Sequence, residues 1–299
     1  MPMREPERMR APIRKRARES MRVGRESSRQ YARGVGWLTT PRRQRGLTFL
    51  YGMYVFHTLV ALHIVTGSIG LVALWVPIVG RKGGPVHKRW GTVFVRALLV
   101  TGVLAIGISL TTLAWPLQTH DFWDDAALIR GLFGWMMLYL ATLTIMLARY
   151  GTVCIRYRRD HARHREPLGI ALQIATLVTA LNCAWHGWQL GQPLMMGIAV
   201  VGTASAILNL RFMFTRTPAH DEWLIQHTRG VVGAGISVYT AFLAFGAVNL
   251  LPAIALHPIL WATPCTLGVA LLLYHQGRIE LARRRRRTGA APLPGQVSG

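Results

Sequence analysis

Long apolar runs alternate with short polar segments over most of this chain. Between residues 48 and 280 the runs are continuous, and several reach the ~18 residues that a helix needs to cross a hydrocarbon core of ~30 Å. Continuous runs argue against a transmembrane β-barrel, whose strands alternate between apolar and polar positions. The pattern predicts an all-α fold, a polytopic transmembrane bundle of about seven helices. The predicted spans are 50–79, 92–116, 127–149, 168–190, 194–210, 229–251 and 258–277.

Two strongly basic segments flank the predicted seven-helix transmembrane domain of residues 48–280. Residues 1–47 contain 14 Lys or Arg against four Glu and almost no apolar periodicity, which predicts a disordered arm. Residues 281–299 form a basic tail that includes five consecutive arginines, Arg283 to Arg287. A net charge of +23 is also typical of nucleic-acid-binding proteins, but in membrane proteins Lys and Arg gather in cytoplasmic segments. We therefore predict anionic lipid headgroups at the cytoplasmic face as a partner, and no nucleic acid.

The charges of the loops predict the orientation of the bundle. Basic loops follow predicted spans one, three and five, whereas the loop "QTHDFWDDA" between spans two and three carries three aspartates. By the positive-inside rule, we expect the basic loops and the C-terminus to be cytoplasmic. Seven spans then place the basic N-terminal arm outside. Two explanations stay open: the true start lies downstream, at Met21 or Met53, or the arm is translocated despite its charge.

Four histidines near the ends of the predicted spans are candidate cofactor ligands. His63 and His87 are too far apart along the chain to share one metal ion or haem, so each needs a partner from another helix. His63 lies in the outer part of span one, and His186 lies near the outer end of span four between Trp185 and Trp188. Two neutral imidazoles from different helices are suitable axial ligands for a b-type haem. The alternative for His186 is a place in an interfacial aromatic belt.

The second predicted pair, His87 and His227, belongs to the cytoplasmic side. Both residues open a helix, and both precede an arginine by two positions, Arg89 and Arg229. This pattern suits a metal or haem site, or an anion bound at two helix N-termini with help from the arginines. Polar interface residues that bond loop carbonyls are the third interpretation.

Other kinds of chemistry receive little support from the sequence. No Asp or Glu lies within any predicted span, which argues against proton-coupled transport through a carboxylate relay. No P-loop, nucleophile elbow or H-E-x-x-H motif occurs, so we predict no catalytic residue. The three cysteines are far apart and form no metal-binding or disulfide pattern. His161 and His164 lie among arginines, where we expect a solvated loop without a function.

Two segments share a pattern of histidines, glycines and apolar runs. In "LHIVTGSIGLVAL…RKGGPVHKRWGTVF" the order is H-x-x-x-G, an apolar run, K-G, and a His followed by a basic residue and a Gly. In "QHTRGVVGAGISVYTAFLAFGAVNLLP" a His opens a helix that ends T-A-F before an Asn. The chain thereby resembles a bacterial family of predicted multi-pass membrane proteins of unknown function, which implies a multi-pass fold in a bacterial inner membrane but no activity. The resemblance rests on His63, Gly67, Lys82, Gly83, His87, Gly91, His227, Tyr239, Thr240, Ala241, Phe242 and Asn249, while Lys88 stands where the family usually has Arg.

Three hypotheses for the function follow. The first is a histidine-based haem- or metal-binding redox membrane protein, with one site at each face so that electrons cross between them. The second is a small-solute or ion permease with histidine gates, because an imidazole changes charge near pH ~6.5. The third is a structural or accessory membrane protein whose histidines serve only packing.

Overall fold

The computed structural model describes residues 42–121, 123–244, 246 and 258–287 of the chain. It contains two compact units, Met1–Gly52 and Met53–Gly299. Of the first unit only the last residues, from Arg42 onwards, are described, and they are helical. Most of the predicted arm at 1–47 and the end of the predicted tail therefore lie outside the described residues.

Every described element of regular structure is a helix, as the sequence predicts. The elements are α2 (Arg42–Val79), α3 (Pro85–Ala114), α4 (Pro116–Thr119), α5 (Ala126–Ile129), the π-helix η3 (Arg130–Met136), α6 (Met137–Arg156), the 3-10 helix η4 (His161–Arg165), α7 (Pro167–Gln189), α8 (Pro193–Phe214), α9 (Glu222–Ala244) and α10 (Pro258–Arg287). Helices α5, η3 and α6 follow one another without a break and together form one long helical segment.

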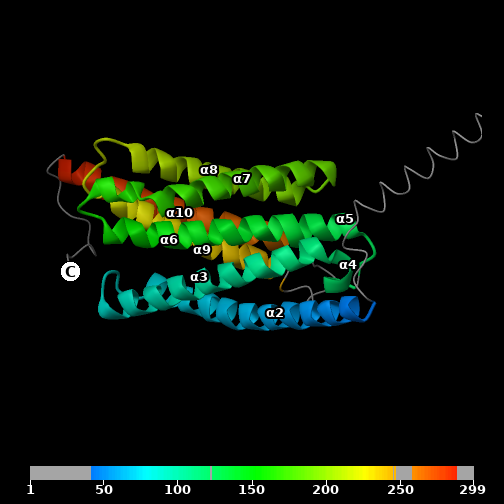
Figure 1. The fold of residues 1–299 in the computed structure, drawn as a ribbon. Helices are drawn as coiled ribbons and strands as arrows, with labels where there is room; N and C mark the ends of the chain where they lie inside the picture. Colours follow the sequence, from blue (N-terminus) through cyan, green and yellow to red (C-terminus); the bar gives the residue numbers. More distant parts are fainter. Residues whose placement is uncertain (1–41, 122, 245, 247–257, 288–299) are drawn as a thin grey trace, which may run out of the picture. The chain divides into compact units, whose positions relative to one another are not determined.

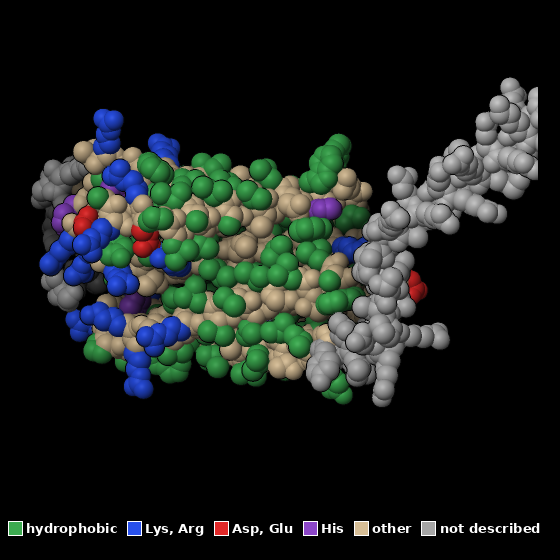
Figure 2. Space-filling model, in the orientation of Figure 1, with side chains coloured by type: hydrophobic (Ala, Val, Ile, Leu, Met, Phe, Trp, Pro, Cys, Tyr) green, Lys and Arg blue, Asp and Glu red, His purple; other side chains and the backbone are tan. Residues whose placement is uncertain are grey.

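Five helical segments are long and apolar enough to cross a membrane, which supports a multi-pass membrane protein. They are Gly52–Val79, Pro85–Ala114, Ala126–Arg156, Pro167–Gln189 and Pro193–Phe214, and they overlap the first five predicted spans. Within the described residues, α9 and α10 overlap the last two predicted spans but do not meet the same requirement. The predicted number of seven is therefore supported only in part. Apolar side chains cover much of the visible surface between the two ends (Figure 2).

Proline and glycine mark the boundaries of several helices. Pro85, Pro167 and Pro193 stand at the first helical position of α3, α7 and α8, where the missing N–H costs nothing and the fixed φ suits a helix. Gly83 and Gly191 have φ values of 76° and 62°, in the left-handed region that glycine adopts without strain. These residues produce the tight turns that join α2 to α3 and α7 to α8.

Helix α6 is the central element of the second unit, where it packs against α3, α7 and α9 (Figure 1). Helix α7 also packs along α8, and α9 packs along α10. The backbones of α6 and α9 approach each other closely, since a Cβ atom added to Gly230 would lie 2.7 Å from the Cα atom of Gly151. This crossing joins the C-terminal part of α6 to the N-terminal part of α9, next to His227.

Candidate functional site

Most of the Lys and Arg side chains visible in Figure 2 gather at one end of the second unit. The chain reaches this end in the turn between α2 and α3, in the segment between α6 and α7, in the loop between α8 and α9, and at the end of α10. We call it the basic end. The predicted alternation of basic and non-basic loops therefore corresponds to a real separation of charge in space.

At the basic end, Lys82 and His87 cap the C-terminus of α2. The Nζ of Lys82 donates to the carbonyl oxygens of Pro77, at 2.8 Å, and of Ile78. The Nδ1 of His87 donates to the same Pro77 oxygen at 3.1 Å. Carbonyls in the last turn of a helix lack partners within the helix, and a nearby cation is favourable there. The "RKGGPVH" segment is thus a helix cap, and partial burial lowers the pKa of Lys82.

His227 joins α9 to α6 beside this cap. Its Nδ1 donates to the carbonyl oxygen of Gly151 at 2.8 Å. Burial lowers the pKa of His227, the bond to Gly151 opposes this effect, and the nearby His87 lowers the pKa further. Both histidines therefore belong to the basic end. Because a carbonyl oxygen only accepts, Nδ1 carries the proton in both rings, and each neutral ring keeps a lone pair on Nε2.

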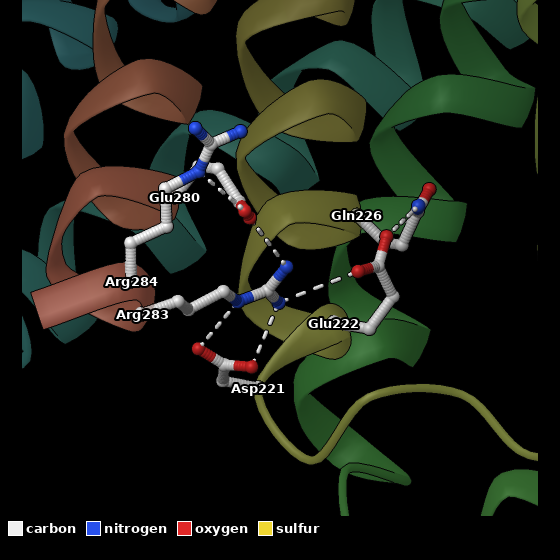
Figure 3. A network of polar contacts seen from close by, with 6 residues as sticks. All are labelled: Asp221, Glu222, Gln226, Glu280, Arg283 and Arg284. Carbon is white, nitrogen blue, oxygen red and sulfur yellow. Dashed lines mark hydrogen bonds and ion pairs between the residues drawn. The ribbon is translucent and has the colours of Figure 1, made fainter. Parts of the chain in front are cut away.

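A network of ion pairs fixes the first turns of α9 (Figure 3). Arg283 of α10 binds Asp221 at 2.7 Å and Glu222 at 3.3 Å. The Nε2 of Gln226 donates to Glu222 at 2.9 Å, and the hydroxyl of Tyr150 on α6 donates to the Oε1 of Gln226 at 2.9 Å. The network links α10, α9 and α6 immediately before His227. It holds the helix that carries this histidine against the carbonyl that orients it.

The two outer histidines lie in separate places. The Nδ1 of His63 donates to the carbonyl oxygen of Thr101 on α3 at 3.2 Å. His186 on α7 stacks on Trp135, with the ring centroids 5.4 Å apart and the planes inclined by 6°. Helices α3 and α6 lie between α2 and α7 in Figure 1. The structure therefore does not bring His63 and His186 together, and a b-type haem shared by this pair has no geometric support.

The structure corrects the expectation that His161 and His164 lie in a solvated loop. The His164 side chain is only 2% exposed, and both rings pack edge-on against Phe212 of α8. Within the described part of the chain, the Nε2 atom of His161 is buried without a hydrogen-bond partner. The reason is that the 3-10 helix folds back onto α8 and directs residues three apart to the same side. Burial lowers the pKa of His164, which favours the neutral ring.

Several residues that carry the family resemblance lie where α2 meets its neighbours. Tyr239 of α9 donates to the carbonyl oxygen of Leu71 at 2.9 Å and accepts a bond from Trp75 at 2.6 Å. A Cβ atom on Gly67 would lie 3.6 Å from the Thr101 side chain of α3. Asn249 lies outside the described residues. Together with the hydrogen bond of His63 and the helix cap, these contacts join α2 to α3 and α9.

Within the described residues, no three His, Cys, Asp or Glu side chains are grouped as metal ligands. A cavity of about 190 Å³ lies between α6, α8, α9 and α10, and none of the four candidate histidines lines it. Sequence analysis did not predict this cavity, because it depends on how four helices pack. Its lining residues on α9 begin with Arg229, which was considered only as a neighbour of His227.

Comparison with protein-family models, curated proteins and solved structures finds no match to this chain. The family resemblance therefore stays a prediction, and the candidate function depends on the geometry alone.

Proposed function

We propose that this chain is a multi-pass redox protein of the bacterial cytoplasmic membrane that holds a haem iron between His87 and His227. The observation that carries the proposal is that two imidazoles at the basic end each donate Nδ1–H to a backbone carbonyl. Histidines that bind metals typically donate their other ring N–H to a carbonyl or carboxylate, which fixes the tautomer and the orientation of the ring. The free Nε2 atoms of His87 and His227 are then the ligands.

The donor set suits haem iron better than a metal bound by protein alone. A structural zinc ion takes four protein ligands, and no group of even three occurs in the part of the chain that the structure describes. A haem would need only two ligands from the protein, and the imidazoles of His87 and His227 would hold it. A bound haem would supply one-electron redox chemistry. The chain itself contributes the two oriented imidazoles.

The absorption spectrum of the purified protein tests this proposal. Expression in cells supplied with a haem precursor, followed by purification in detergent, is expected to give a Soret band and bound iron. His87→Ala and His227→Ala each remove one ligand, so each variant should lose the band or shift it strongly.

Two control variants separate ligation from folding. Lys82→Ala removes a bond to the same Pro77 carbonyl without removing a ligand, and His220→Ala removes an exposed histidine of the α8–α9 loop. Both should keep the band. A wild-type preparation without colour or iron would contradict the proposal. The hydrogen bonds of His87 and His227 would then only hold the helices together.

A further inference from the structure

The cavity between α6, α8, α9 and α10 is built from regular stripes of side chains. On α9 the stripe runs along one face, with a residue on every turn. Its members are Arg229, Gly233, Ile236, Ser237 and Thr240. Positions three, four, seven and eight apart share one face of a helix, so the cavity runs along the helix axis. From Arg229 to Thr240 the helix rises by about 16 Å.

The cavity is polar at one end and mostly apolar along its length. Arg229 and Asn209 line it within about two helical turns of the basic end. Further along, the walls come largely from apolar side chains such as Leu143, Ile198 and Val269. This arrangement matches a ligand with a polar head and an apolar tail that lies parallel to the helices.

Arg229 has no counter-ion of its own. Within the residues that the structure describes, it forms no ion pair and no hydrogen bond, whereas the acidic residues at the basic end all pair with other arginines. These acidic residues are Asp160, Glu166, Asp221, Glu222 and Glu280. A guanidinium group beside an apolar cavity is stabilised when an acidic group binds it, and its flat geometry suits carboxylates and phosphates. The missing counter-ion therefore indicates an anionic ligand.

The position of the cavity also indicates where the ligand comes from. Helix α8 packs along α7 and α10 packs along α9, so the cavity lies at the junction of two helix pairs that meet across α6. Val201 and Val269, which line the cavity, are exposed, so in a membrane they would lie against lipid. A dry cavity of ~150 Å³ binds one benzene molecule, so a cavity of about 190 Å³ accommodates part of one acyl chain.

We propose that this cavity binds a membrane amphiphile with an acidic headgroup, which contacts Arg229 while one acyl chain lies along α9. The required chemistry is an acid joined to an acyl chain. A free fatty acid and an anionic phospholipid both provide it. The part of the cavity beyond Arg229 would hold only the acyl chain.

Displacement of a fluorescent long-chain fatty acid from the detergent-purified full chain tests the proposal. The competitors are a long-chain fatty acid, the alcohol of the same chain length, a single-chain lysophosphatidic acid and a two-chain anionic phospholipid. The acids are expected to displace the probe at least about tenfold better than the alcohol, because only they form charge-assisted bonds with Arg229. The single-chain and two-chain competitors distinguish a free acid from a bilayer lipid as the source.

Variants assign the two parts of the site. Arg229→Gln should remove the preference for acid over alcohol, and Arg229→Lys should keep most of it. Ser205→Phe fills the cavity from α8 and should weaken binding of acid and alcohol alike, with Arg229 intact. Arg89→Gln removes a charge at the basic end away from the cavity and should change nothing. Equal binding of acid and alcohol to the wild type, or unchanged binding in folded Arg229→Gln and Ser205→Phe, would overturn the proposal.

Discussion

Three of the four candidate histidines donate Nδ1 to a backbone carbonyl of another segment: His63 to Thr101, His87 to Pro77, and His227 to Gly151. The sequence indicated that these histidines matter, because polar residues near apolar runs need partners. It could not reveal the partners, since every residue carries a carbonyl group and only packing decides which one lies within reach. For the same reason, the sequence could not show that His63 contacts Thr101 whereas His186 stacks on Trp135.

At the residue scale, His120 should make the protein less stable in acid. It lies in the loop between α4 and α5, is 9% exposed and packs against Phe133 with the ring centroids 4.2 Å apart. Burial lowers the pKa of His120 from 6.5 to about 4, although the nearby Asp121 opposes this shift. Between these values the unfolded chain binds a proton that the folded protein excludes, so stability is complete above pH 6.5 and falls towards pH 4.

Thermal unfolding in detergent across this pH range measures the effect. His120→Gln should flatten the dependence on pH, although a part remains because burial also lowers the pKa of His164 and His227. Equal pH dependence in the wild type and in His120→Gln would show that the His120 ring is not protected from protons in the folded state.

At the scale of the elements, the length and the composition of the apolar runs predicted the first five helices but not all of their ends. Helix α3 begins at Pro85 rather than at the predicted residue 92, and α6 ends at Arg156 rather than at residue 149. A run of apolar residues must be helical in a membrane, because the backbone has to satisfy its own hydrogen bonds there. Features that depend on tertiary contacts were not predictable. The π-helix at Arg130–Met136 and the fold-back of His161 and His164 onto Phe212 are two such features, since no local pattern distinguishes them from an ordinary helix or loop.

The crossing of α6 and α9 depends on glycine, and Gly230→Leu should disrupt it. A Cβ atom at this position would lie 2.7 Å from both the Cα and the N atom of Gly151, so the two backbones must separate. We expect a loss of about 2 kcal/mol or more in the free energy of unfolding. The hydrogen bond from His227 to Gly151 should also lengthen, so the Soret band expected for the wild type should weaken.

Gly91→Ala is a matched control, because a Cβ atom on Gly91 has nothing within 4 Å. This substitution should leave unfolding unchanged or stabilise α3 by about 0.5–1 kcal/mol, the usual helix preference of alanine over glycine. If Gly230→Leu and Gly91→Ala unfold alike, the close contact between α6 and α9 does not contribute to stability.

At the scale of the whole molecule, most of the basic side chains and both proposed sites lie at the same end. The helix cap, the pair of His87 and His227, the ion pairs of Arg283 and the polar end of the cavity all lie at the basic end. The loop that contains Asp121, Asp124 and Asp125 connects α3 to α6 at their opposite ends. The orientation in the membrane therefore decides which compartment both proposed sites face.

Labelling of single cysteines with a membrane-impermeant maleimide determines this orientation. Asp124→Cys and Arg89→Cys place a thiol at exposed positions near opposite ends, in a Cys265→Ser background in which the remaining native cysteines are buried. By the positive-inside rule, Asp124→Cys should react in intact cells and Arg89→Cys only after permeabilisation. The opposite result would place the basic end outside. It would also move Arg229 away from the leaflet whose anionic lipids would supply the amphiphile, so an inverted bundle would have to take a free acid from the outer side.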